Sequence, residues 1–363
     1  MSTIVLSAGG TGGHLFPAQA LADELARRGH AIVVMTDARF KNYETAFPTA
    51  RIATVPSAAF SDRSAWRLAT APFEILAGIT LSLIKLSRLK PRVVVGFGGY
   101  PSLPVMLAAC LKRIPTVILT PDALLGRANR LLANHVQRIA ANLPLVRFLP
   151  KDMSKVVYTG NPLRADVIAH ADAPYPALGA HNRIELLVFG GSQGAHVFSE
   201  IVPAALARMP AQLRARLHLT QQCRPEDLAA VSEAYAQMGI DAELAPFFSD
   251  LPRRMADAHL VVARAGAGTV SELALIGRPA ILVPLPHALD DNQMPNAEAF
   301  ATAGAGWAVR QSELSAIRLA EILVAAFADP NALAHKARCA RRLAYPGATE
   351  RLADLVEELG RAS

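Results

Sequence analysis

The chain has few cysteines, few aromatic residues and no long apolar run. Its 363 residues include three cysteines, Cys110, Cys223 and Cys339. A small, odd and scattered set of this kind indicates reduced thiols, not a disulfide framework or a zinc site. No apolar run reaches the roughly 18 residues that a membrane-spanning helix needs. The N-terminus lacks a basic segment followed by an apolar run and a cleavage site. We therefore expect a cytoplasmic protein.

Acidic side chains are also fewer than basic ones. There are 37 lysines and arginines against 30 aspartates and glutamates, which gives a formal net charge of +7. This balance favours acidic partners such as anionic lipid, nucleic acid or phosphorylated substrates, although an ordinary solvated basic surface gives the same balance. With 52% hydrophobic residues, the chain is long and apolar enough for two folded domains.

A glycine-rich stretch near the N-terminus lies between a predicted strand and a predicted helix. The strand is 3–6, the glycines are Gly9, Gly10, Gly12 and Gly13, and the helix runs from Pro17 to Arg28. Glycines at such a turn let backbone N–H groups approach an anionic or polar ligand. His14, at the exit of the loop, titrates near neutral pH and is a candidate acid or base. The alternative is a tight turn with a solvated histidine.

Short apolar runs alternate with helical patterns along the whole chain. This alternation predicts an α/β fold with two doubly wound, mostly parallel sheets, and ligands at the carboxyl ends of the strands. We expect one domain over residues 1–161, a second over 162–345, and a last helix over 346–363 that packs back on the first. The predicted strands are 3–6, 31–35, 51–55, 93–95, 116–119 and 138–140, then 184–189, 217–219, 260–263 and 280–283.

Further glycine loops follow predicted strands. Gly96 to Ser102 opens a helix, with Ser102 as its expected N-cap. Gly190 to Gly194 fits both the nucleophile elbow of α/β-hydrolases and a seat for a diphosphate. A hydrolase would also need an acid and a histidine downstream, for which His287 is available, but it would leave the other loops without a use. Glu272 lies in the first turn of a later helix, where it can bind a ribose diol or simply complement the helix dipole.

The stretch from Phe73 to Lys90 is unusually apolar. Between Glu74 and Lys85 it carries no charge, its apolar residues around Ile79 cover more than one helical face, and basic residues follow. Such a helix suits the surface of an anionic bilayer, and it equally suits burial against a sheet.

Six motifs, in order and over essentially the whole chain, resemble the MurG family within glycosyltransferase family 28. These bacterial cell-wall enzymes transfer N-acetylglucosamine from its UDP-sugar to undecaprenyl-diphospho-muramoyl-pentapeptide. The motifs are Gly9–His14, Gly98–Ser102, Gly160–Arg164, Gly190–Ala195, Arg264–Glu272 and Asp291–Ala297. The resemblance implies a GT-B fold, with two Rossmann-like domains facing across a cleft, the donor held mainly by the C-terminal domain and the acceptor by the N-terminal one. It also implies a peripheral protein on the cytoplasmic face of the inner membrane, no cofactor beyond the UDP-N-acetylglucosamine substrate, no metal and no nucleic acid.

The resemblance also implies roles for individual residues. His14 is the candidate base. Ser192, Gln193 and Gly194 would bind the diphosphate, Phe248 the uracil through its backbone, Glu272 the ribose and Gln293 the sugar hydroxyls. The remaining donor-site residues are Thr11, Gly12, Gly13, Arg164, Ala267, Gly268, Thr269 and Asn296, and the acceptor-side residues are Gly98, Gly99, Tyr100 and Asn129.

This chain departs from the family at the acceptor side. Family members carry His-Glu-Gln-Asn where this chain has Thr120 to Ala123, and Asn292 stands where histidine is common. Asp122 replaces part of the lost function or is itself the base. Three other activities stay open on the sequence: a UDP-sugar transferase for another lipid, a non-hydrolysing UDP-sugar 2-epimerase, and an NAD-dependent oxidoreductase. The oxidoreductase fits least, because only Asp37 is acidic near the end of the second strand and no Gly-x-Gly-x-x-Gly fingerprint follows the first.

Overall fold

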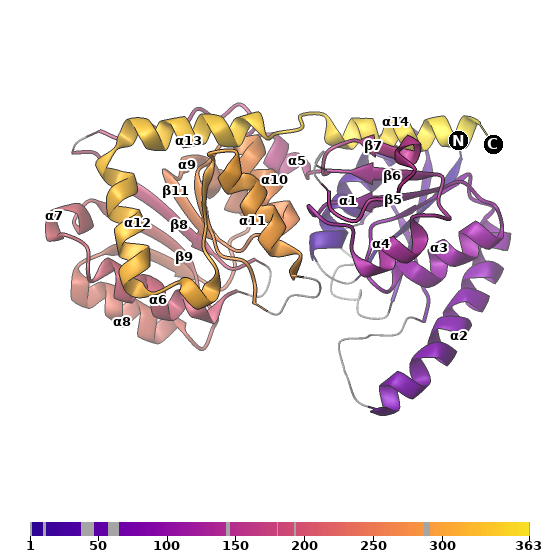
Figure 1. Ribbon diagram of the computed structural model, residues 1–363, viewed down its shortest axis with the longest axis horizontal. Helices are drawn as coiled ribbons and strands as arrows, with labels where there is room; N and C mark the ends of the chain where they lie inside the picture. Colours follow the sequence, from indigo (N-terminus) through magenta and orange to yellow (C-terminus); the bar gives the residue numbers. More distant parts are fainter. Residues whose placement is uncertain are drawn as a thin grey trace. The chain divides into compact units, whose positions relative to one another are not determined.

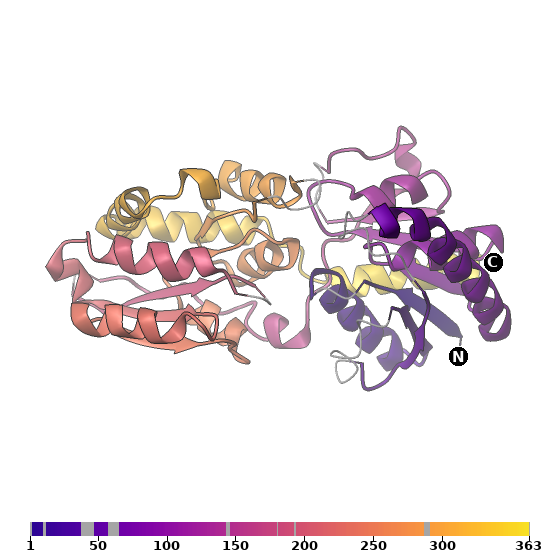
Figure 2. The same cartoon turned by 90° about the horizontal axis from the view of Figure 1, so that it is seen from below.

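The chain folds into two compact units (Figure 1). Unit 1 comprises Met1–Arg164 and Tyr345–Ser363, and unit 2 comprises Ala165–Ala344. The computed structural model describes residues 2–9, 12–37, 47–56, 65–142, 146–179, 181–191, 194–286 and 291–362. Both units have a parallel sheet with helices on its two faces (Figure 1 and Figure 2).

Unit 1 is built on a seven-stranded sheet of order β3-β2-β1-β4-β5-β6-β7. Every strand pair in it is parallel, and Val5 of the central β1 pairs with Val33 on one side and Val94 on the other. The strands between the two edges are largely buried, which explains their apolar runs. The strands are β1 (Thr3–Ser7), β2 (Ala31–Thr36), β3 (Arg51–Thr54), β4 (Val93–Gly96), β5 (Thr116–Thr120), β6 (Arg138–Ala141) and β7 (Val156–Tyr158).

Alternate side chains of β1 face two different helical layers. Ile4 and Leu6 pack in one apolar cluster with α1 (Gly12–Arg27) and α14 (Ala348–Arg361). Val5 packs in another with α2 (Ala65–Leu89), α3 (Ser102–Leu111) and α4 (Arg127–Leu132). The period of two in a strand produces this division. The last helix of the chain therefore belongs to the core of unit 1.

Unit 2 repeats the design with a six-stranded parallel sheet of order β10-β9-β8-β11-β12-β13. The strands are β8 (Ile184–Phe189), β9 (Leu217–Gln222), β10 (Asp241–Ala245), β11 (Leu260–Ala263), β12 (Ala280–Leu282) and β13 (Gly306–Ala308). The helices are α5 (Ala165–Ile168), α6 (His196–Leu206), α7 (Ala211–Arg214), α8 (Leu228–Met238), α9 (Leu251–Asp257), α10 (Ala267–Ile276), α11 (Gln293–Thr302), α12 (Ala316–Ala328) and α13 (Pro330–Arg342), and short 3₁₀ turns lie at Met153–Lys155 in unit 1 and Gln311–Glu313 in unit 2.

The prediction of two doubly wound parallel α/β sheets is confirmed. All ten predicted strands are present, but the sequence reading missed β7, β10 and β13. The first helix starts at Gly12 instead of Pro17, so that start was wrong by a turn. Pro17 is the sixth residue of α1, where it removes one backbone hydrogen bond without ending the helix. His14 consequently lies in the first turn of α1.

Candidate active site

His14 lies at the carboxyl edge of the unit 1 sheet, against the glycine loop that follows β4. A Cβ built on Gly98 would stand 3.2 Å from both Cδ2 and Nε2 of the imidazole, and one on Gly99 would stand 3.7 Å from Cε1. Both glycines have positive φ, +88° and +75°. The second loop therefore has no side chains where the ring of His14 lies, and its backbone takes a conformation that favours glycine.

Asp122 acts electrostatically on His14. Burial is the main influence on the ring and lowers the pKa of His14 below its usual 6.5, while the Asp122 carboxylate opposes this by raising it. A neutral imidazole that can accept a proton at neutral pH results. The structure therefore brings the two candidate catalytic residues within electrostatic range of each other.

The segment that carries Asp122 is held in place by hydrogen bonds from neighbouring residues. Asn142 donates from Nδ2 to the carbonyl of Pro121 at 2.9 Å. The backbone of Arg147 donates to the Ala123 carbonyl and accepts from the Leu125 amide, both at 2.9 Å. These bonds fix the loop after β5.

Asn129, on α4, is close to the same place. Its Nδ2 donates to the Leu119 carbonyl at 2.9 Å, and Nδ2 also lies 3.7 Å from the Cβ built on Gly98. Only 5% of Asn129 is exposed, and within the described part of the chain its Oδ1 accepts no hydrogen bond. Because burying an unsatisfied hydrogen-bond acceptor is costly, this oxygen is suited to accept a hydrogen bond from a ligand hydroxyl.

The structure also describes other predicted residues of unit 1. Ser102 is the first residue of α3 and its hydroxyl donates to the Gly99 carbonyl at 2.8 Å, so the expectation that it caps the helix was wrong. Gly12 and Gly13 begin α1, and Tyr100 is half-buried beside Gly99 in the loop. Arg164, at the end of the unit, stacks its guanidinium on Phe16 at 4.6 Å.

In unit 2 the loop after β8 leads into α6. A Cβ on Gly190 would stand 2.3 Å from the Ala195 nitrogen, and Gly191 and Gly194 have φ of +83° and +66°. The backbone thus turns tightly before the N-terminus of α6, and the positive end of that helix dipole favours an anion.

Two arginines adjoin this loop. Arg224 lies beside Gly194, since its Cγ would be 3.2 Å from a Cβ there. Arg264 is 8% exposed, stacks on Phe198 of α6 and donates to the carbonyls of Val283 and Pro284. Burial, with the Arg224 charge as a second cause, lowers the pKa of Arg264 to about 10. The Arg264 guanidinium is therefore charged at neutral pH, and both arginines lie close to the loop that leads into α6.

The loop after β10 presents the residue expected to bind the uracil. Phe248 is 7% exposed, and the guanidinium of Arg254 lies 4.4 Å from its ring centroid. Arg254 is itself held by Glu243 and Asp250. The Phe248 ring is thus fixed in place, which in turn fixes the position of its backbone.

The other donor-site residues lie on α10 and α11. Ala267, Gly268, Thr269 and Glu272 occupy the first turns of α10. Asn296 is buried and donates to the Ala265 carbonyl at 3.1 Å, while the Gln293 Oε1 accepts from the Leu285 amide at 2.9 Å. Both amides hold neighbouring loops, and Asn292 precedes them at the start of α11.

Some predicted residues lie outside the described part of the chain, namely Thr11, Ser192, Gln193 and the alternative histidine His287. Gln222 and Arg224 were missed by the sequence reading, although polar residues at the carboxyl end of a strand were a signal available for both. Within the described ranges no group of three or more His, Cys, Asp or Glu is placed to hold a metal ion. The described helices include none with the length and apolarity needed to cross a bilayer.

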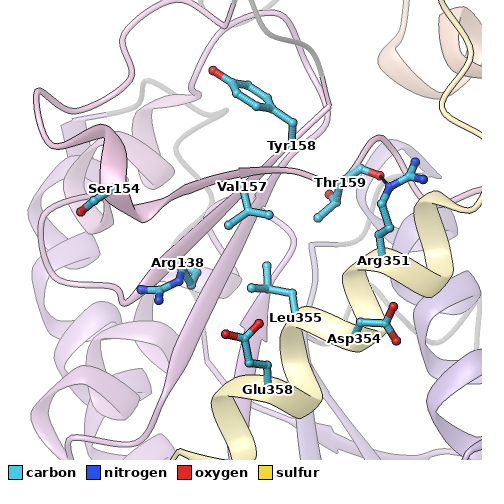
Figure 3. A pocket seen from close by; sticks show the side chains of 9 residues that line it. All are labelled: Arg138, Ser154, Val157, Tyr158, Thr159, Arg351, Asp354, Leu355 and Glu358. Atoms are coloured by element: carbon cyan, nitrogen blue, oxygen red, sulfur yellow. Dashed lines mark hydrogen bonds between the residues drawn. The ribbon is translucent and has the colours of Figure 1, made fainter.

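A separate pocket of about 410 Å³ lies in unit 1 between α14 and the β6–β7 edge (Figure 3). Two of its charged side chains are already engaged: Arg351 donates to the Thr159 carbonyl and Asp354 accepts from Arg28. The pocket contains none of the predicted site residues. Its lining is Arg138, Ser154, Val157, Tyr158, Thr159, Arg351, Asp354, Leu355 and Glu358.

Two doubly wound parallel sheets with glycine loops at their carboxyl edges are features of the GT-B fold, and comparison with solved structures agrees. Acinetobacter baumannii MurG superposes with a TM-score of 0.81 at 29% identity, covering 99% of this chain and 100% of that one. UDP-GlcNAc 2-epimerase from Neisseria meningitidis gives a TM-score of 0.66 at 13% identity, with 98% and 100% coverage. The second likeness concerns the fold alone.

The models of the glycosyltransferase family 28 N-terminal and C-terminal domains match residues 4–141 and 185–359. The chain belongs to glycosyltransferase family 28. Two curated relatives are each called UDP-N-acetylglucosamine--N-acetylmuramyl-(pentapeptide) pyrophosphoryl-undecaprenol N-acetylglucosamine transferase. The one from Methylobacterium radiotolerans is 49% identical over 98% of this chain and 97% of its own length. The one from Methylorubrum populi is 51% identical over 99% and 98%.

Proposed function

We propose that this protein transfers N-acetylglucosamine from UDP-N-acetylglucosamine to an undecaprenyl-diphosphate-linked muramoyl-pentapeptide, a step of peptidoglycan synthesis. The observation that carries the proposal is identity of about one half, over nearly the full length of both chains, with transferases that bear this name. The glycine loops at the carboxyl edges of two parallel sheets suit a sugar nucleotide and a second substrate.

Unit 1 would bind the acceptor and carry the base. Neutral His14 would remove the proton from the acceptor hydroxyl as its oxygen attacks the anomeric carbon, with inversion. Gly98, Gly99 and Tyr100 would form the wall of this site beside the ring. Asp122 would support the imidazole, and the buried Oδ1 of Asn129 would accept a hydrogen bond from the acceptor.

Unit 2 would bind the donor. The backbone at Phe248 would pair with uracil, Glu272 would accept from the ribose hydroxyls, and Gln293 would reach the sugar. The backbone of Ala267, Gly268 and Thr269, at the start of α10, would pass close to the nucleotide. Asn296 would position the loop before α10. The family resemblance also assigns Arg164, Thr11, Gly12 and Gly13 of unit 1 to the donor.

Departure of UDP requires stabilisation of the charge that develops on its diphosphate. The N-terminus of α6, reached through Ser192, Gln193 and Gly194, would supply backbone donors. Arg264 and Arg224 add two positive charges near the same loop, and burial makes the Arg264 charge more effective. Groups of the protein itself would thus stabilise the charge on the departing UDP, and we expect transfer in the presence of a chelator.

The protein would act on the cytoplasmic face of the inner membrane, held there through α2. Phe73, Leu76 and Ile84 of this helix are 75%, 62% and 45% exposed. Lys85 and Arg88 follow on the same helix. An exposed apolar stripe with a basic flank suits an anionic bilayer surface. Ile79, which lies within the apolar stretch noted in the sequence, packs against the core of unit 1.

The direct test is transfer of radiolabelled N-acetylglucosamine from its UDP-sugar to the lipid-linked muramoyl-pentapeptide by the purified protein, with and without chelator. Transfer in both tubes is the expected result. Binding of the UDP-sugar without transfer to this lipid would contradict the proposed acceptor and point to another, which the changed Thr120–Ala123 segment makes the first alternative. Conversion of the free UDP-sugar to its 2-epimer would instead identify an epimerase.

A further inference from the structure

Gln222 is the last residue of β9, and β9 lies between β8 and β10 in the sheet of unit 2. The loops that follow these two neighbours are the proposed diphosphate loop, of which Gly190, Gly191 and Gly194 are described, and the proposed uracil loop at Pro246–Phe248. The Gln222 side chain therefore occupies the position on the sheet from which both loops are within reach.

The amide of Gln222 is bonded to both loops at once. Its Oε1 accepts from the Gly190 amide at 2.9 Å, and its Nε2 donates to the Gly191 carbonyl at 2.9 Å and to the Pro246 carbonyl at 3.1 Å. The orientation follows from the partners, because the reverse would set an NH₂ against an N–H and an oxygen against two carbonyls. The side chain is 5% exposed, so water competes little for these bonds.

The Gln222 amide adds connections at the points where the two loops leave their strands. Gly191 and Gly194 lie in the left-handed region, where a glycine backbone has wide freedom to rearrange. Beyond β10 the last ladder bond runs from the Cys223 amide to the Ala245 carbonyl, and Pro246 has no N–H to donate. Gln222 supplies the next connection along both loops.

We propose that Gln222 is a positioning residue that fixes the diphosphate loop and the uracil loop in one mutual arrangement, so that the two ends of UDP bind as a unit. This inference rests on the proposed donor site. Two preorganised subsites bind a ligand that spans both far more tightly than either subsite binds its fragment of that ligand. If one subsite can move relative to the other, this gain in affinity is lost. Gln222 should therefore matter much more for UDP than for uridine, which lacks the diphosphate.

The test compares Gln222→Met with Gln221→Met. Methionine keeps the length of the side chain and removes all three hydrogen bonds. Gln221 is the neighbouring residue of the same strand and is fully buried. It bonds to Tyr235 and to the Phe198 carbonyl of α6, and not to the loop residues that Gln222 contacts. Its variant controls for a general loss of stability, and thermal unfolding of both proteins fixes a temperature at which each remains folded.

The readouts are the inhibition constants of UDP and uridine in the transfer assay, with KM for the UDP-sugar and kcat. For Gln222→Met we expect the UDP constant to rise at least about tenfold and the uridine constant less than about threefold, with a larger change in KM than in kcat. Gln221→Met should keep the wild-type ratio of the two constants.

Equal changes in the UDP and uridine constants for Gln222→Met, or no change in either, would overturn the proposal while leaving the donor site in place. The same shift in ratio for Gln221→Met would also overturn it. A wild-type protein that binds no UDP would instead contradict the proposed function itself, so the two failures are distinguishable.

Discussion

The imidazole of His14 lies where a side chain on Gly98 would be: a Cβ there would stand 3.2 Å from both Cδ2 and Nε2. Gly98→Ala should therefore displace the ring and lower kcat at least about tenfold, with UDP binding unchanged. Gly29→Ala is the matched control, since Gly29 has a similar φ of +85° but open space around its Cβ. Equal losses in both variants would mean that backbone strain, and not the contact with His14, is responsible.

His14→Ala should lower transfer by a factor on the order of 10² to 10⁴, the usual contribution of a general base, and keep UDP binding. His135→Ala, at an exposed histidine of the same unit, is the control. Unchanged turnover in His14→Ala would remove His14 as the base.

Asp122 should set the pH dependence of the same step. A base acts in its neutral form, so the lowered pKa of His14 places the acidic limb of the kcat/KM profile below 6.5. Because the Asp122 carboxylate raises that pKa, Asp122→Asn should move the limb to still lower pH while transfer continues. Loss of transfer in Asp122→Asn at every pH would make Asp122 the base instead.

Glu272 should make the protein prefer UDP over 2′-deoxy-UDP. Glu272→Ala should weaken UDP binding about tenfold, since a hydrogen bond to a charged group contributes roughly 1.5 to 3 kcal/mol. The same variant should bind UDP and 2′-deoxy-UDP with nearly equal affinity. Calorimetry measures both, with Glu233→Ala on the exposed face of α8 as control. A retained preference for UDP would assign Glu272 to the helix dipole alone.

The sequence predicts buried strands far better than edge strands. Strands such as β4 and β11 are buried on both faces and read as unbroken apolar runs. The missed strands β7, β10 and β13 all lie at the edge of a sheet, where only one neighbour supplies hydrogen bonds. β10 even contains Asp241 and Glu243, which are both exposed to solvent. Residue pattern alone does not separate such segments from loops.

Some residues of the site are also predictable from the sequence, and others are not. Glycine loops are visible in the sequence because their backbone requires glycine, as at Gly98 and Gly191. The side chains that hold those loops are not evident from the sequence. Gln222 can bond to both loops only because β9 lies between β8 and β10 in the sheet. Likewise the apolar stretch of α2 predicted an amphipathic helix, but only packing separates inward Ile79 from outward Leu76.

Arg28 should stabilise the docking of α14 on α1. It donates to Asp354 at 2.6 Å and to Glu357 at 3.3 Å, and it is 18% exposed. Arg28→Ala should lower the free energy of unfolding by about 1 to 3 kcal/mol, because the carboxylates lose a charged donor. Arg27→Ala is the control, since Arg27 is largely exposed and pairs only with Glu24 among the described residues. Urea titration at pH 7 measures both.

The same contact should depend on pH. A hydrogen bond with His30 is the main cause, and the Arg28 charge a further one, of the lowered pKa of Glu357 in the folded protein. A carboxyl whose pKa is lower in the folded protein than in the unfolded chain stabilises the fold when the pH is above the unfolded-state pKa. This stabilisation is lost as the pH falls through the folded-state pKa. The difference between Arg28→Ala and wild type should therefore shrink below about pH 4. A constant difference down to pH 3 would contradict the role of these carboxylates.

The exposed stripe of α2 should determine binding to membranes. Leu76→Glu replaces a side chain that is 62% exposed, and it should weaken binding to phosphatidylglycerol vesicles at least about tenfold through lost apolar burial and added repulsion. Ile317→Glu, at a 58% exposed position of α12 in unit 2, is the matched control and should bind as wild type does. Because neither side chain packs in a core, thermal unfolding should be nearly unchanged in both. Vesicle sedimentation that ranks the two variants equally would show that α2 is not the membrane-binding face.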